Sequence, residues 1–151
     1  MSISKLSLSK KDFIDHVVDE FYRQATTDIL IGHQFRKIAL KERDLHSKDG
    51  HHPLRPPLEA FAHHLPRIKS FWYIQLIGET KTADQAPFDL IQIHRELSIR
   101  MGELNRWLVL FDGVLIQSLK EVENQEKMTP FVQLWREKVS LFENRFKNIL
   151  F

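Results

Sequence analysis

The second half of this chain carries apolar residues at intervals of three and four positions, and this pattern limits the fold more than any other feature of the sequence. One stripe runs from Leu104 to Val122, and another from Phe131 to Ile149 behind a Thr129-Pro130 pair that is expected to cap its helix. Such spacing places side chains on one face of an α-helix, whereas a half-buried strand alternates every second residue. No alternation of useful length occurs in the 151 residues. The sequence therefore predicts an all-α fold.

Two more helices are expected in the first half of the chain. Ser9 precedes a helical pattern over residues 10–26, and a serine hydroxyl there can accept a hydrogen bond from a free backbone N–H of the first turn. A second pattern begins at Pro57 and ends at Gly78. Pro66 lies inside it and predicts either a kink or a later restart of the helix.

Length and composition narrow the class of protein. A chain of 151 residues is expected to form one domain, residues 1–151, in which the charged, proline-containing segment 36–56 is a mobile connection. The net charge of +2 is too small to indicate nucleic-acid binding. The absence of cysteine excludes disulfides, thiolate metal sites and cysteine nucleophiles. No secretory signal or membrane-spanning stretch is evident, so we expect a cytoplasmic protein without membrane contact.

His94 is the only histidine after His64, and its neighbours in the sequence are mostly apolar. Haem iron is commonly bound by an axial neutral imidazole, held by a short rigid segment on one face of the haem. His94 is therefore a candidate iron ligand. The alternative interpretation of this residue by itself is a half-exposed helix histidine without a ligand.

Other residues are suited to the opposite side of a haem. His64, Ile68 and Phe71 are separated by four and three positions and so share one helix face. The Tyr22 hydroxyl and the Trp107 indole N–H can both donate hydrogen bonds to the partial negative charge of bound dioxygen. Taken singly, each of these residues is more often structural and fills a core.

In their order along the chain these residues resemble the third group of truncated haemoglobins, which are small bacterial globins with a two-over-two helical sandwich. The strongest part of the resemblance is the helix from His64 to Gly78 together with the region of Trp107. The matching residues are Phe21, Tyr22, Asp28, Phe35, His64, Ile68, Phe71, Trp72, Gly78, His94, Arg106, Trp107, Leu108, Leu110 and Phe111.

The resemblance implies a bound haem (iron protoporphyrin) with His94 as the proximal iron ligand. It implies a distal polar cluster of Tyr22, His64 and Trp107. The residues that it implies for haem binding are Phe35, Arg67, Ile68, Phe71, His94 and Trp107, with Arg67 near a propionate.

A globin of this kind would bind dioxygen or another diatomic gas, with redox chemistry on nitric oxide or peroxide as a further expectation. An electron donor would then be a partner, and the chain would be a monomer or a weak dimer. Whether the protein is an enzyme stays open at this point.

Two alternatives also stay open. The segment between Gly78 and His94 is longer than is usual in the family, so the chain could be a haem-free globin-like helical domain that acts as an interaction or regulatory module. A non-haem metal site is less favoured, because adjacent histidines do not converge on a helix and no H-E-x-x-H motif is present. Its candidate ligands would be His46, His51, His52, His63 and His64.

Overall fold

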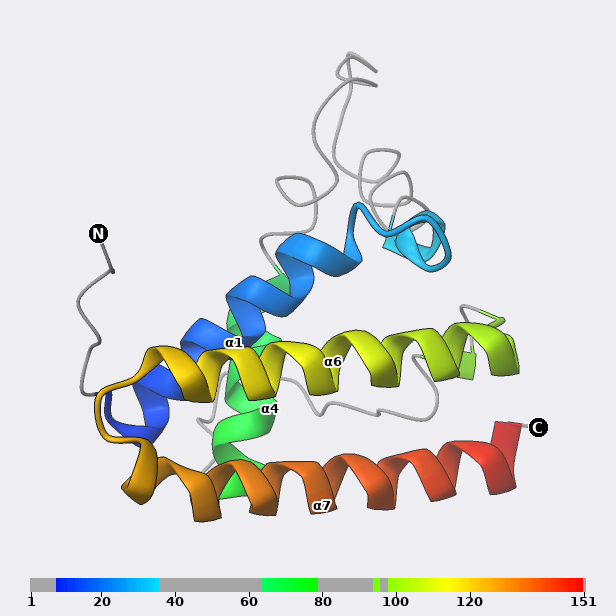
Figure 1. Cartoon of the computed structure of the whole chain (residues 1–151). Helices are drawn as coiled ribbons and strands as arrows, with labels where there is room; N and C mark the ends of the chain where they lie inside the picture. Colours follow the sequence, from blue (N-terminus) through cyan, green and yellow to red (C-terminus); the bar gives the residue numbers. More distant parts are fainter. Residues whose placement is uncertain (1–7, 36–63, 79–93, 96–97, 151) are drawn as a thin grey trace.

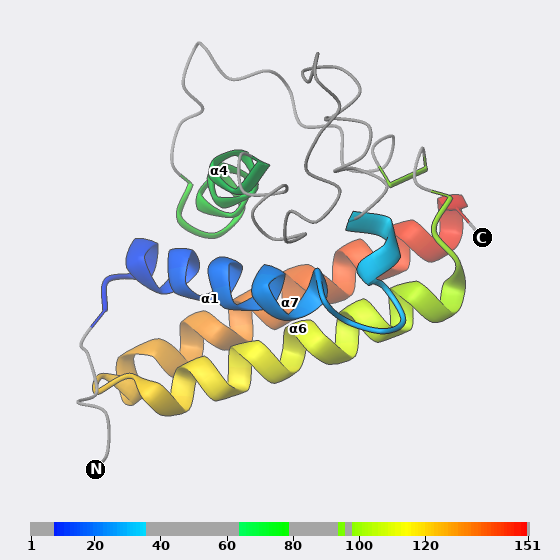
Figure 2. The same cartoon turned by 90° about the horizontal axis from the view of Figure 1, so that it is seen from above.

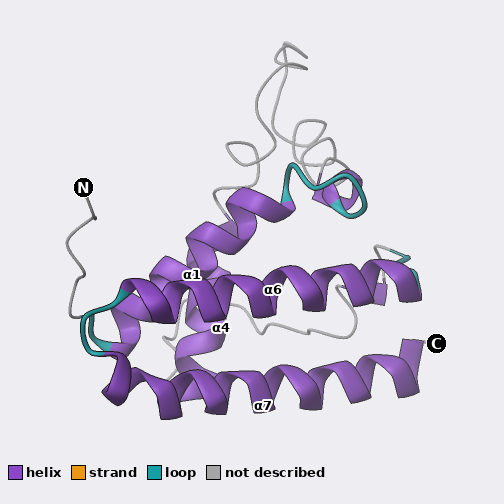
Figure 3. Ribbon diagram, viewed as in Figure 1, coloured by secondary structure: helices purple, strands orange, loops and turns teal. Residues whose placement is uncertain are grey.

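The computed structural model describes residues 8–35, 64–78, 94–95 and 98–150 of the chain. Within these residues the secondary structure is helical and no strand occurs, which confirms the all-α prediction (Figure 3). Over the same ranges, no helix combines the length and apolar character needed to cross a membrane. The predicted connection 36–56 and the predicted helix start at Pro57 lie outside the described residues. The long helices are α1 (Lys10–Ala25), α4 (Leu65–Ile77), α6 (Met101–Glu121) and α7 (Gln125–Leu150).

The helices α6 and α7 lie side by side and run in opposite directions (Figure 1). Helix α1 packs against α6 and also against α4. Helix α4 runs across the long helices, so it is seen end-on when the molecule is viewed from above (Figure 2), and it also contacts α7. The core therefore lies where α1 and α4 meet the α6–α7 pair.

Helix α1 forms as its sequence predicts. The Ser9 hydroxyl accepts a hydrogen bond from the Asp12 backbone N–H at 3.1 Å, which supplies the expected cap. The helix ends one residue before the predicted boundary, at Ala25, and the Thr26 hydroxyl donates to the Tyr22 carbonyl at 2.7 Å. Its buried face consists of Phe13, Ile14, Val17, Val18, Phe21 and Ala25.

Helix α4 begins beside Pro66, where the sequence left a kink or a restart open, and it ends at Gly78 as predicted. Pro66 lies in the first turn, where a missing N–H costs nothing, so it marks a helix start and not a kink within the described part. Gly78 ends the helix with φ +67°, a left-handed conformation that glycine adopts without strain.

The predicted start of the last helix is wrong, because α7 begins at Gln125 and Pro130 lies inside it. Proline cannot donate the hydrogen bond that the helix would otherwise make at this position. The helix nevertheless continues through Pro130, since an earlier start buries Met128 together with Phe131. At the other end, the apolar stripe predicts that Ile149 is buried, but 48% of it is exposed.

Candidate functional site

Three of the residues predicted to surround a haem lie in a row of ring contacts that includes Phe21 on α1. The ring centroids of Phe21 and Tyr22 are 4.8 Å apart, and those of Phe21 and Trp107 are 5.2 Å apart. Phe35, in a helical turn at residues 32–35, lies 5.7 Å from the Tyr22 ring. The fold thus brings Tyr22, Phe35 and Trp107 together from α1, the turn that follows it, and α6.

Tyr22 is half-buried in this group. Burial raises the pKa of its hydroxyl above the ordinary tyrosine value, because a phenolate is poorly solvated there. The hydroxyl therefore keeps its proton throughout the physiological pH range and remains able to donate a hydrogen bond.

Three predicted residues lie at the start of α4. His64 is the N-cap residue, but its side chain makes no capping hydrogen bond, and its Nε2 atom is shielded from solvent. Arg67 is exposed in the first turn of the helix, whereas Ile68 is half-buried and packs against the core. This end of α4 therefore offers one imidazole, one cation and one apolar contact.

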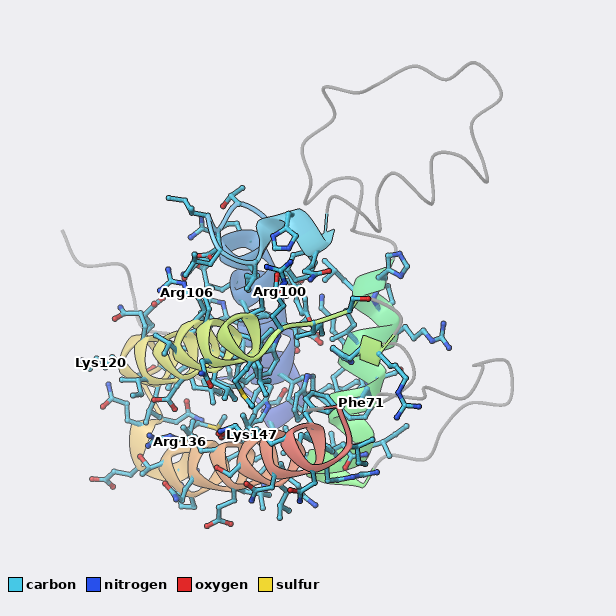
Figure 4. All side chains as sticks on the ribbon, turned by 90° about the vertical axis from the view of Figure 1, so that its right-hand side faces the viewer. Phe71, Arg100, Arg106, Lys120, Arg136 and Lys147 are labelled. Carbon is cyan, nitrogen blue, oxygen red and sulfur yellow. The ribbon has the colours of Figure 1, made fainter. Side chains whose placement is uncertain are left out.

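His94 and Phe71 both contact helix α7. The His94 ring lies 5.0 Å from that of Phe146, and the Phe71 ring lies 5.6 Å from that of Phe142. Phe142 and Phe146 are four positions apart and so share one face of α7. Figure 4 shows Phe71 on the part of α4 that approaches α7. The predicted iron ligand His94 and the predicted haem-binding residue Phe71 therefore lie against the same face of α7.

Trp72 connects the two groups of predicted residues. Its ring lies 5.1 Å from that of Phe71 and 5.9 Å from that of Phe111. Phe111 in turn stacks on Trp107 at 4.8 Å with an angle of 5° between the planes. A continuous set of aromatic contacts therefore runs from the α7 side of the core to the Tyr22 side.

An ion pair that the sequence did not indicate fixes the turn after α1 onto α6. Arg106 donates to Asp28 Oδ1 at 2.8 Å, and the backbone N–H groups of Leu30 and Ile31 donate to Oδ2. The Arg106 hydrogen bond is the main reason why the pKa of Asp28 lies below its usual value. Arg106 precedes Trp107 on α6, so the pair holds the turn close to the Tyr22 group; Figure 4 shows where Arg106 leaves the helix.

A second polar contact joins the same turn to α6. The Glu103 carboxylate accepts a hydrogen bond from Gln34 at 3.0 Å and lies 2.7 Å from His33 Nε2. Nothing in the sequence distinguishes His33 from an ordinary surface histidine, and 46% of its side chain is exposed. Together with Asp28, Glu103 anchors the segment that carries Phe35.

Replacing Asp28 by asparagine is expected to lower the free energy of unfolding at neutral pH, because the variant loses its charge attraction to Arg106 but keeps an oxygen for the backbone N–H groups. Because the pKa of Asp28 is lowered in the folded protein, its carboxylate stabilises the fold at pH values above the pKa of the unfolded state. This stability is lost as the pH falls through the pKa of the folded state. The difference between wild type and variant should therefore shrink in acid. Denaturant unfolding at a series of pH values measures this difference in stability.

Asp112→Asn is the control, because Asp112 and its partner Arg136 are 42% and 45% exposed. An equal loss of stability in Asp112→Asn would contradict the prediction.

Two hollows are lined by described residues. One of about 270 Å³ lies between α1 and α6, and one of about 180 Å³ lies between α6 and α7. Neither is lined by a residue that the sequence predicts for haem binding. In the described ranges no three His, Asp or Glu side chains gather as a metal site, and His46, His51, His52 and His63 lie outside them. These two hollows therefore do not mark the predicted haem site.

Comparison with models of known protein families gives no match, and neither does comparison with curated proteins or with solved structures. The resemblance to truncated haemoglobins therefore depends on the residues of the chain itself.

Proposed function

We propose that this chain is a haem-binding globin of the truncated, two-over-two kind that binds dioxygen or another diatomic gas. The observation that carries the proposal is a row of ring contacts that joins Phe35 to Tyr22, Tyr22 to Phe21, and Phe21 to Trp107. Phe35, Tyr22 and Trp107 come from separate elements and are distant in sequence, yet each was singled out for the same cofactor. The packing of α1 and α4 on the antiparallel α6–α7 pair suits a two-over-two sandwich.

The residues present fit a haem chemically. His94 is a half-buried imidazole beside the apolar ring of Phe146, and an imidazole can bind haem iron. Phe35, Ile68 and Phe71 are apolar surfaces suited to a porphyrin face. When bound, the haem would be held by His94 and would supply an iron able to bind a gas molecule.

The polar residues would control how long the bound gas molecule is retained and how it reacts. The Tyr22 hydroxyl and the Trp107 N–H can donate hydrogen bonds to an oxygen atom that carries partial negative charge, and His64 would do so from α4. Arg67 is exposed at the start of α4 and is suited to pair with a carboxylate of the haem. Several donors around one gas molecule slow its escape, which favours redox chemistry on nitric oxide or peroxide over simple oxygen delivery.

The test is an absorption spectrum of the purified chain after reconstitution with haem, recorded in the ferric and ferrous states and with carbon monoxide. We expect a sharp Soret band that shifts when carbon monoxide is added. A spectrum that matches free haem would overturn the proposal and favour the haem-free interaction or regulatory module instead.

Replacing Tyr22 by phenylalanine is expected to leave haem binding intact and to speed dissociation of dioxygen. Loss of one hydrogen bond to a charged group costs about 1.5–3 kcal/mol, which corresponds to roughly tenfold or more in the off-rate if the whole effect falls there. Stopped-flow displacement of dioxygen by carbon monoxide measures the rate. Tyr73→Phe, at the only other tyrosine of the chain, is the control, and an unchanged rate in Tyr22→Phe would contradict the assigned role.

A further inference from the structure

The hollow between α1 and α6 is a candidate binding site that the haem proposal does not use. It has a volume of about 270 Å³. Four of its lining residues are spaced four positions apart on α6 and so form one row along that helix: Val109, Gly113, Gln117 and Glu121. Because an α-helix rises by about 1.5 Å per residue, the row is about 18 Å long. The hollow is therefore an elongated groove.

A buried hydroxyl lines this groove. Ser118 on α6 is only 1% exposed and is one of its lining residues. The other two buried polar side chains of the described residues both make hydrogen bonds, since the Thr26 hydroxyl donates to the Tyr22 carbonyl and the Gln34 amide donates to Glu103. The Ser118 hydroxyl makes no hydrogen bond with a described residue. Because a buried hydroxyl without a partner costs free energy, its partner must come from whatever fills the groove.

Helix α1 contributes two polar side chains to the groove, Glu20 and Gln24. The Glu20 carboxylate accepts hydrogen bonds from Arg23 Nε at 2.9 Å and from the Gln24 amide nitrogen at 3.0 Å. The Arg23 hydrogen bond is the main reason why the pKa of Glu20 lies below its usual value, so Glu20 is ionised at neutral pH. Because the Gln24 amide nitrogen donates to Glu20, the Gln24 carbonyl oxygen is the part of that side chain suited to accept a hydrogen bond from a ligand.

The hydrogen-bond acceptors lie toward the two ends of the groove. Asp28, just after α1, pairs with Arg106 near the start of α6, so the end of α1 that carries Gln24 lies toward the start of α6. Glu121 is the last residue of α6 and therefore lies at the opposite end. Between the two ends, α6 contributes the buried apolar side chain of Val114. None of the described residues that line the groove is a lysine, an arginine or a histidine.

We propose that this groove binds a linear organic polycation, in which ammonium groups are separated by methylene chains. Ammonium groups donate hydrogen bonds and accept none, so they match the Gln24 oxygen at one end and the Glu121 carboxylate at the other. The Ser118 hydroxyl oxygen accepts from the same ligand, and the methylene groups pack on Val114. An anionic ligand would be repelled by Glu20 and Glu121, and a compact ligand would leave part of the groove unfilled.

The test is a titration of the purified chain with 1,8-diaminooctane, a linear diammonium probe, followed by isothermal titration calorimetry at low ionic strength. The groove contains none of the residues proposed to bind haem, so the outcome is independent of the haem proposal. We expect saturable binding that weakens as salt is added, because salt screens exposed charges. Octane-1,8-diol has a chain of the same length without the charges and should not bind measurably. In nuclear magnetic resonance spectra, the diamine should shift backbone amide signals of residues 20–24 and 109–121.

Gly113→Leu separates binding from folding. Gly113 is exposed, and a Cβ added to it would meet no atom within 4 Å, so a leucine side chain can occupy the groove without disturbing the core. Leucine also favours a helix more than glycine does, so the variant should keep its stability. We expect Gly113→Leu to abolish binding of the diamine. Gly102→Leu is the matched control, because Gly102 is equally open on α6 but does not line the groove.

Glu121→Gln should weaken binding by up to roughly fivefold, as expected for the loss of one exposed charge pair. Glu123→Gln is its control, because Glu123 is also exposed but does not line the groove. Three results would overturn the proposal: no saturable binding of the diamine, equal binding of the diol, or equal effects of a variant and its control. Circular dichroism establishes that each variant is folded.

Discussion

A chain carrying His94→Ala is expected to lose the ability to retain haem, whereas the unaltered chain should keep it through gel filtration. The substitution removes the imidazole that is proposed to bind the iron, and the remaining contacts to the haem would be apolar packing and a propionate pair. Titration with haem, followed at the Soret band in the ferric and ferrous states, measures the loss.

Two controls separate a ligand role of His94 from a role in folding. His33→Ala removes another histidine, one that is paired with Glu103 and 46% exposed, and should leave the spectrum unchanged. Free imidazole added to His94→Ala should restore an axial ligand and with it the Soret band. A normal five-coordinate ferrous spectrum in His94→Ala without added imidazole would show that another residue binds the iron.

The sequence predicted the ends of helices correctly where a residue acts only through its neighbours in the chain. Ser9 caps α1 through a hydrogen bond within the first turn, and Gly78 ends α4 because it adopts positive φ. Pro130 shows the limit of such signals. It is a good first-turn residue, but burial of Met128 and Phe131 against the core starts α7 earlier. A contact that forms only after folding therefore outweighed a local preference.

The same limit applies to the candidate site. Spacing within α4 correctly placed Ile68 and Phe71 on the same helix, and residue chemistry singled out Tyr22 and Trp107. The ion pair between Asp28 and Arg106 joins residues far apart in sequence, so no local pattern reveals it. Both residues belong to the set that resembles truncated haemoglobins, and this was the only signal available for them.

The contact of Phe111 with three indoles is likewise invisible in the sequence, where Phe111 is one more apolar residue of a helical stripe. It arises because α4, α6 and α7 converge at this level of the core. Such a contact could not be predicted before the packing of the helices was known.

Replacing Trp135 by alanine is expected to lower the free energy of unfolding by about 3–5 kcal/mol, as is typical when a large buried aromatic residue is truncated. Trp135 is fully buried, and its ring lies 5.3 Å from that of Trp72 and 6.3 Å from that of Phe13. The cavity would therefore open where α1, α4 and α7 meet. Since a whole domain is stabilised by about 5–15 kcal/mol, this loss should be a large part of the total stability.

Trp135→Phe separates the contribution of the ring from that of the indole N–H. No described residue accepts a hydrogen bond from Nε1, and a buried N–H without a partner costs about 1–3 kcal/mol. Phenylalanine removes this penalty while it keeps most of the aromatic packing, so Trp135→Phe should lose far less stability than Trp135→Ala.

Denaturant unfolding at constant pH measures the stability of both variants. The control is Leu134→Ala, at a neighbouring residue that is 37% exposed. Equal costs for Trp135→Ala and Leu134→Ala would mean that the core is not organised around this residue. Equal costs for Trp135→Phe and Trp135→Ala would mean that the indole N–H has a partner in the folded protein.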